Sequence, residues 1–303
     1  MGERRGRGVT GRALATLDGV WHAGLGGAVY ATGIGAAFLQ LSGLWWRRDG
    51  SFLASALVGI FCAAWGMMIA DRAKWRDGQL DPADEAAWPL RSRFVRAHRR
   101  ALRVSGVGLL LIGGVLCTIA GGPVGGACVL AGSLSILLYS GRPAGRPSPW
   151  GRLKDIPLIK NVFVGGGLLT LAAGVGLGRS GNLSAWTGYA PLLLALAVVA
   201  TGDAMLCDLP DIEADRAYGV RTAPVIWGRL PGALLATLLI VGGSVWAASL
   251  AGSNRVGPFW LAGMSGGALL ALGLGDRWIK GVIDARPLLP AILVGAILAG
   301  GGS

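Results

Sequence analysis

Apolar segments long enough to cross a bilayer recur along this chain and restrict what it can fold into. Nine can be drawn, each near the ~20 residues that a membrane-spanning helix needs. Hydrophobic residues make up 53% of the chain and charged residues only 15%, against roughly a quarter charged in soluble proteins. We therefore predict an all-α, polytopic membrane protein with one transmembrane domain over residues 1–303. The segments are residues 21–44, 52–71, 101–121, 123–141, 158–178, 187–207, 226–250, 257–275 and 286–301.

Basic residues distinguish the two sides of this domain. If the basic tail, residues 1–20, is cytoplasmic, 24 of the 28 Lys and Arg residues fall on the inner side. Cytoplasmic loops carry such an excess, so we predict an inner-membrane protein with a cytoplasmic N-terminus and a C-terminus on the opposite side. This asymmetry also accounts for the net charge of +12 without a nucleic-acid partner. The outer loops are short, so we expect any chemistry on the inner side; their basic residues are Arg47, Arg48, Arg179 and Arg255.

An acidic stretch follows the sixth apolar segment. Asp208, Asp211 and Asp215 stand at i, i+3 and i+7, so one continuous helix would present their carboxylates on one face. Acids are unfavourable at a helix C-terminus, where the macrodipole favours cations, and they are costly near a bilayer. A bound cation would offset this cost, and Mg²⁺ takes carboxylate oxygens while often holding a phosphate. The stretch therefore predicts a divalent-metal site, with Mg²⁺ as the favoured ion.

A second charged region follows the second apolar segment. Asp71 and Asp77 are six residues apart, which fits one helix face poorly, and Lys74 would pair with Asp71 or with a phosphate. A dense basic run extends from Arg91 to Arg100. Two interpretations stay open for this region: phosphate binding, or an amphipathic connector whose basic side chains reach the lipid headgroups.

Lys160 and Asn161 are polar residues just inside the fifth apolar segment. Polar groups at this depth are expected to face a cavity or the bundle interior, where a lysine can bind phosphate as a point charge. The alternative is that Lys160 extends to the interface, as lysines near helix ends often do. The loop from Asp276 to Arg286 indicates only a charged interfacial segment with a tryptophan anchor.

The acidic stretch belongs to a longer pattern, Asp208-x-x-Asp211-x-x-x-Asp215-x-x-x-Gly219-x-x-Thr222-x-Pro224-Val225-x-x-Gly228. This pattern resembles the second aspartate-rich motif of the UbiA superfamily, which are intramembrane prenyltransferases with nine transmembrane helices. Tyr139-Ser140 and the stretch from Lys154 to Asn161 are also similar to family members. The resemblance therefore spans most of the chain and implies a bundle of nine transmembrane helices.

The first aspartate-rich motif of that family is degenerate in this sequence. Members usually carry Asn-Asp-x-x-Asp-x-x-x-Asp at the end of the second helix. The best register places Ala70 at the Asn, Asp71 at the first Asp, Lys74 at the second and Gly78 at the third. Only Asp71 matches, so the chain resembles a divergent branch of the superfamily.

The resemblance also implies a reaction and a site. In the family, Mg²⁺ bridges both acidic motifs to the diphosphate of an isoprenoid donor, and a lipophilic, usually aromatic acceptor attacks the ionised prenyl group. Residues 72–100 and 208–225 would form a cytoplasmic cap over this site, where Lys74 would partly substitute for a metal. The expected catalytic and metal-binding residues are Asp71, Asp208, Asp211 and Asp215. The expected diphosphate-binding residues are Arg72, Lys74, Lys154, Lys160, Asn161, Arg216 and Arg221.

Other functions remain open at this point. The acid-to-lysine change at Lys74 is compatible with a catalytically silent relative that binds a lipid or quinone. A transporter is disfavoured, because no internal repeat is evident and the charges gather at one face rather than at the midplane. The acceptor of a transferase could be a quinone precursor, a porphyrin-type ring, a chlorophyll-like pigment or a phosphosugar.

Overall fold

The computed structural model describes residues 16–74, 82–140, 159–180, 183–251 and 256–300, and every regular element in these ranges is helical. Seven helices there are long and apolar enough to cross a membrane, which confirms the all-α membrane class. The elements, in chain order, are η1 (Trp21–Leu25), α2 (Gly26–Leu41), α3 (Leu44–Arg47), α4 (Gly50–Ala73), α5 (Pro82–Ala87), α6 (Pro89–Ala97), α7 (Arg99–Ser140), α8 (Ile159–Leu177), η3 (Gly178–Ser180), α9 (Leu183–Cys207), η4 (Leu209–Asp211), α10 (Ile212–Ala217), α11 (Ala223–Trp227), α12 (Arg229–Leu250), α13 (Val256–Leu274), α14 (Asp276–Ala285) and α15 (Leu288–Gly300).

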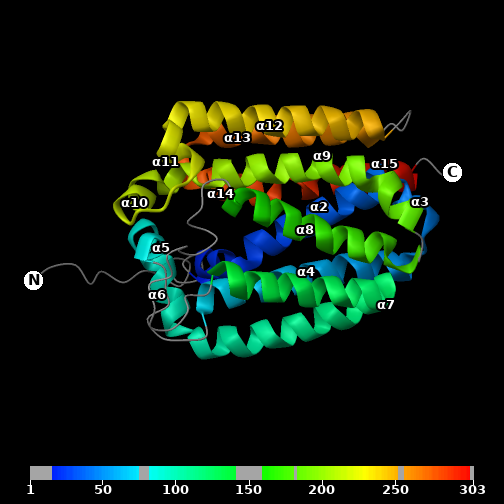
Figure 1. Cartoon of the computed structure of the whole chain (residues 1–303), viewed down its shortest axis with the longest axis horizontal. Coiled ribbons are helices and arrows are strands. Elements are labelled where there is room, and N and C mark those ends of the chain that lie inside the picture. Colours follow the sequence, from blue (N-terminus) through cyan, green and yellow to red (C-terminus); the bar gives the residue numbers. More distant parts are fainter. Residues whose placement is uncertain (1–15, 75–81, 141–158, 181–182, 252–255, 301–303) are drawn as a thin grey trace, which may run out of the picture.

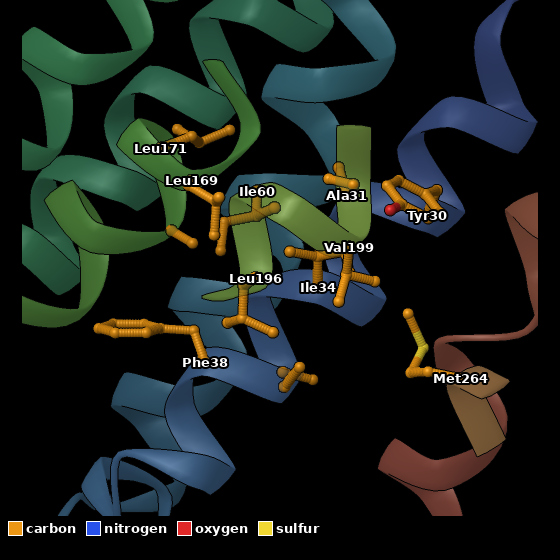
Figure 2. Close-up of a cluster of buried hydrophobic side chains, with 14 of the residues drawn as sticks. Tyr30, Ala31, Ile34, Phe38, Ile60, Leu169, Leu171, Leu196, Val199 and Met264 are labelled. Carbon is orange, nitrogen blue, oxygen red and sulfur yellow. The ribbon is translucent and has the colours of Figure 1, made fainter. Parts of the chain in front are cut away.

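Helix α2 forms the centre of the bundle. The span Thr16–Leu41, which contains α2, is 78% buried inside the protein, against 28% for α12. Helix α2 contacts α4, α8, α9 and α12 to α15. Figure 2 shows Ile34 and Phe38 of α2 among Ile60, Leu169 and Leu196, which come from α4, α8 and α9. The remaining spans surround α2, with α4 against α7, α7 against α8, α8 against α9 and α9 against α12.

The outward faces of the surrounding helices are apolar, as contact with lipid requires. Leu230, Leu234 and Leu238 of α12 recur at four-residue spacing and are each more than half exposed. Leu111, Ile112 and Val115 form a similar exposed face on α7. In water these surfaces would be unfavourable, so they mark the membrane-facing sides of the bundle.

Helix α7 contains the third and fourth expected segments and folds back on itself. Gly122 has φ +66° and ψ −162°, outside the helical region, and Pro123 follows it. Beyond this break Gly125 lies so close to the first arm that a Cβ there would be 2.2 Å from the carbonyl oxygen of Cys117. The two arms, residues 99–121 and 123–140, therefore form a helical hairpin with its turn at Gly122-Pro123.

Close backbone contact joins the first arm of this hairpin to α4. A Cβ at Gly113 would lie 2.5 Å from the backbone nitrogen of Ala63, so only glycine fits there. Small residues at such interfaces are the usual basis of helix packing in membranes. The high glycine content of the chain is thus used, at this interface, to bring α4 and α7 together.

The bundle has two ends of different character (Figure 1). Helices α5, α6, α10 and α11 gather at one end, beside the C-terminal end of α9. Helix α3 lies at the opposite end. The two acidic segments, at the ends of α4 and α9, are therefore on the same side of the bundle.

Candidate functional site

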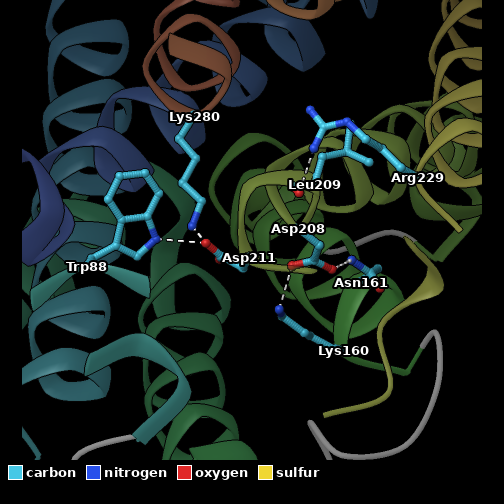
Figure 3. Close-up of polar contacts among 8 residues, drawn as sticks. All are labelled: Trp88, Lys160, Asn161, Asp208, Leu209, Asp211, Arg229 and Lys280. Atoms are coloured by element: carbon cyan, nitrogen blue, oxygen red, sulfur yellow. Dashed lines mark hydrogen bonds and ion pairs between the residues drawn. The ribbon is translucent and has the colours of Figure 1, made fainter. Parts of the chain in front are cut away.

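The second acidic segment lies where α9 gives way to two short elements. Helix α9 ends at Cys207, a 3₁₀ turn (η4) covers Leu209–Asp211, and α10 begins at Ile212. Pro210 has no backbone N–H, so it cannot continue the i→i−4 bonding of α9, and Asp211 N–H instead donates to the Asp208 carbonyl at 3.1 Å. The structure thus differs from the expected continuous helical face, because Asp208 and Asp211 project toward different partners (Figure 3).

This break also changes the electrostatic setting of the acids. Asp208 stays at the C-terminal end of α9, but Asp211 is the residue before α10 and Asp215 lies in its first turn. Acids are favourable near a helix N-terminus. The expected cost of an acid at a helix C-terminus therefore applies to Asp208 alone.

Asp208 is held by two side chains from the start of α8. Lys160 Nζ donates to Oδ1 at 2.5 Å and Asn161 Nδ2 donates to Oδ2 at 3.0 Å (Figure 3). Asp208 is only 3% exposed, and a buried carboxylate needs such partners because water does not solvate it. Lys160 therefore faces the acidic segment, which answers the open question of its direction.

Asp211 is held by two residues that come from elsewhere in the chain. Lys280 Nζ of α14 donates to Oδ2 at 2.6 Å, and Trp88 Nε1 donates to Oδ1 at 2.7 Å (Figure 3). The Trp88 ring also receives two cations, with Arg91 at 4.1 Å and Lys280 at 5.0 Å from its centroid. Trp88 thereby joins the connector of α5 and α6 to the acidic segment.

The first acidic segment closes the C-terminal end of α4. Lys74 Nζ donates to Asp71 Oδ1 at 2.6 Å. Lys74 has φ +43°, a strained value for a residue with a Cβ, and two arginines of α7 stabilise this turn. Arg99 Nε donates to the Ala73 carbonyl and Arg103 Nε donates to the Lys74 carbonyl, each at 2.8 Å.

The remaining expected site residues lie at the same end with different surroundings. Arg72 is half-buried in the last turn of α4. Asp215 is buried, whereas Arg216 and Arg221 are exposed. Lys154 and Asp77 lie outside the described residues.

The loop after Asp215 explains the glycines of the sequence pattern. Gly219 follows the C-cap residue of α10 at φ +72°, and Gly228 precedes α12 at φ +92°; both values favour glycine. Pro224 lies in the first turn of α11, where its missing N–H costs nothing. These residues set the path of the chain from α10 to α12.

The sequence analysis missed three residues that bond to one another inside the bundle, next to this site: Tyr30, Asp203 and Arg286. Asp203 of α9 accepts from Tyr30 Oη at 2.5 Å and from Arg286 Nη2. Both members of the Asp203–Arg286 ion pair are almost fully buried. An acid inside the apolar segment 187–207 was the available signal, since ionisable residues at such depth are commonly functional. Lys280 was likewise overlooked, in a loop interpreted as merely interfacial.

Comparison with known proteins identifies the family. The sequence model of the family described as "UbiA prenyltransferase family" matches residues 19–280 of this chain. This chain belongs to the UbiA prenyltransferase family. Two solved structures of a UbiA homolog from Archaeoglobus fulgidus, bound to DMAPP and Mg²⁺ and to GPP and Mg²⁺, are 15% and 16% identical to it. Each comparison covers 93% of this chain and 98% of the homolog, with TM-scores of 0.56 and 0.59. No curated protein matches the chain in sequence.

The aspartate-bearing end has carboxylates that could bind Mg²⁺, but its described residues form no complete metal cage. Within the described ranges, no group of three or more acidic, histidine or cysteine side chains is arranged to hold a metal alone. Mg²⁺ in phosphate-processing sites is usually held by one or two carboxylates together with substrate phosphates. The buried carboxylates of Asp208 and Asp211 fit that requirement, and a lysine ammonium now lies against each of them.

Proposed function

We propose that this chain is an intramembrane prenyltransferase that transfers an isoprenyl group from a prenyl diphosphate to a lipophilic acceptor of the aromatic, quinone-precursor type. The observation that carries the proposal is the set of three lysine–aspartate pairs, Lys74–Asp71, Lys160–Asp208 and Lys280–Asp211, at one end of a UbiA-family bundle. Carboxylates that could bind the metal and ammonium groups that could bind the diphosphate therefore lie together at this end of the bundle.

The mechanism assigns complementary tasks to the two members of each pair. Asp71, Asp208, Asp211 and Asp215 would hold Mg²⁺, which when bound supplies charge neutralisation of the diphosphate leaving group. The lysines would then bind diphosphate oxygens as point charges, together with Asn161 and, by family resemblance, Arg72, Lys154, Arg216 and Arg221. Heterolysis of the carbon–oxygen bond releases diphosphate, the acceptor attacks the allylic cation, and an aromatic acceptor then loses a proton. The apolar helices exclude water that would otherwise capture the cation.

The membrane arrangement follows from the same proposal. If the α7 hairpin makes two crossings and α15 (Leu288–Gly300) makes the last, the chain has the nine crossings that the sequence predicts. The basic, aspartate-bearing end faces the cytoplasm, with the C-terminus on the opposite side. Residues 72–100 and 208–225 form the cap, and the Trp88–Asp211 bond supports this because it joins the two segments.

Diphosphate release by purified protein tests the proposal. Wild-type protein in lipid nanodiscs, incubated with Mg²⁺, a panel of prenyl diphosphates and an aromatic acceptor, is expected to release diphosphate. Asp208→Asn and Asp211→Asn should each lower the release by about 10²–10³-fold. Glu213→Gln is the matched control, because Glu213 is an exposed acid in the same segment. Equal release by the wild type and both Asp variants would overturn the proposal.

The second candidate is a catalytically silent family member that binds a lipid or quinone. The observation that favours it is Lys74, which occupies an acid position of the family motif and neutralises Asp71. It predicts that prenyl diphosphate with Mg²⁺ leaves the thermal unfolding midpoint unchanged. A ligand at a concentration well above its Kd raises the midpoint of the folded protein, so a shift of several degrees would exclude this candidate.

A further inference from the structure

A polar cavity of about 260 Å³ lies at the end of the bundle opposite the aspartates. It forms between the α3–α4 junction, the bend of α7 and the turn after α8. Three of its lining residues are arginines, Arg47, Arg48 and Arg179. The sequence places only four basic residues on this side, so the fold gathers three of them around one cavity.

The bend of α7 determines where Arg179 lies. Pro123 has no N–H, so the carbonyl of Ile119, four residues earlier, loses the donor that a continuous helix would supply. Arg179 Nη2 donates to that carbonyl instead. A guanidinium carries five N–H donors in a rigid fork, and this bond fixes the fork at the cavity wall.

The opposite wall is the start of α4. Arg48 lies with its guanidinium carbon 5.0 Å from the centroid of the Phe52 ring. Asp49 caps the helix, with its carboxylate accepting from Phe52 N–H at 2.7 Å and from Ser51 Oγ at 2.9 Å. These hydrogen bonds lower the pKa of Asp49, with smaller contributions from Arg179 and Arg48, so Asp49 is ionised at neutral pH.

The charges of the lining do not cancel. Three arginines face one aspartate, which leaves an excess of two positive charges in a cavity at the membrane surface. Asp49 is already committed to the start of α4, and among the described residues no ion pair joins it to these arginines. Arginine is the side chain that recognises phosphate with paired N–H groups. An anion with one or two negative charges would neutralise the cavity.

We propose that this cavity binds a phosphate group, supplied by the headgroup of an anionic phospholipid in the leaflet opposite the aspartates. Basic pockets between transmembrane helices bind phospholipid headgroups on the cytoplasmic or matrix side of membranes, and arginines at the opposite end offer the same contacts to a headgroup phosphate. The adjacent Trp46 is 42% exposed and lies at the position where tryptophans mark the membrane interface. The cavity therefore opens at the depth where lipid phosphates lie, whereas the aspartate site at the other end takes a metal-bound diphosphate.

Thermal unfolding of the detergent-purified chain, titrated with phosphatidylglycerol, tests the proposal. The midpoint of the wild type should rise with phosphatidylglycerol more than with phosphatidylcholine. Arg47→Gln/Arg48→Gln should raise the phosphatidylglycerol concentration that gives half of the shift by about tenfold, the effect of losing one charge-assisted bond. Arg93→Gln/Arg100→Gln removes two exposed charges from the other end and is the matched control. Neither pair removes a buried contact, so both variants are expected to fold.

The outcomes separate the two sources of the phosphate. A shift with inorganic phosphate, lost in the Arg47→Gln/Arg48→Gln variant, would support the phosphate site but assign it to a soluble ligand. A shift with phosphatidylglycerol alone supports the lipid headgroup. Equal phosphatidylglycerol titrations for the wild type and the Arg47→Gln/Arg48→Gln variant would overturn the proposal. These results do not depend on whether the chain releases diphosphate.

Discussion

Two helix ends carry the acids of the candidate site, and they are built differently. At the end of α4, Asp71 is bonded by Lys74, the residue directly after the helix, and arginines of the adjacent α7 bond the turn. At the end of α9, Asp208 and Asp211 are bonded by side chains from α8, α14 and the α5–α6 connector. The first acid is held by its neighbours in sequence, whereas the second pair depends on the assembly of the whole bundle.

The difference extends into the membrane along α9. Asp203 lies deeper in α9 than Asp208. It joins α9 to α2 through Tyr30, and it joins α9 to the turn after α14 through Arg286. Polar contacts of α9 thus continue from the interface into the core. Loss of the α9 contacts should therefore lower the stability of the whole protein, whereas changes at the end of α4 should have only local effects.

The largest effect is expected from the buried ion pair. Arg286→Met leaves the Asp203 carboxylate buried without its cation and should cost about 3–5 kcal/mol of unfolding free energy. The measurement is the unfolding midpoint in detergent. Arg229→Met is the control, because its partner Asp276 is exposed and such surface pairs contribute about 0–1 kcal/mol. Asp203→Leu/Arg286→Met should recover most of the loss; a double variant as unstable as the single one would contradict this account.

The next effect concerns catalysis and compares the acids of the two helix ends directly. Asp211→Asn should lower diphosphate release by about 10²–10³-fold, the range for a group that stabilises developing charge. Asp71→Asn should lower it less, because Lys74 already balances the Asp71 carboxylate within the same helix end. Rates with saturating donor and Mg²⁺ decide the order. A larger loss for Asp71→Asn would reverse the proposed roles of the two helix ends.

A smaller effect is expected at Lys74. Lys74→Met removes an ammonium group that the proposed function assigns to the diphosphate, and KM for the donor should rise about tenfold. Arg93→Gln, an exposed basic residue of α6, should leave KM unchanged. If KM for Lys74→Met equals that of the wild type, Lys74 serves only the end of α4.

The smallest effect is expected at the connector. Trp88→Phe keeps an aromatic ring for Arg91 and Lys280 but removes the hydrogen bond to Asp211, at a cost of about 1 kcal/mol. Amide hydrogen exchange over Pro89–Ala97 should become faster, because this bond joins the connector to η4. Trp46→Phe, at the opposite end of the bundle, should not change exchange in that helix.

The class of protein, the approximate spans and the family could all be predicted from the order of the amino acids. Apolar runs of about twenty residues can satisfy their backbone hydrogen bonds within a membrane only as helices or closed barrels. The spacing of Asp208, Asp211 and Asp215 together with Gly219, Pro224 and Gly228 was specific enough to indicate the UbiA family. These signals are local, because helix length, turn geometry and proline or glycine positions are properties of neighbouring residues.

The residues that contact the acids could not be predicted in this way, because they come together only when the helices pack. Lys280 and Trp88 are 69 and 123 residues away from Asp211, and no local pattern relates such positions. Pro210 was visible in the sequence, but its consequence, two carboxylates with different partners, required the positions of α8 and α14. The arginines of the opposite end looked isolated for the same reason. Their charges gather at one cavity because Pro123 leaves a carbonyl that Arg179, 60 residues away, satisfies.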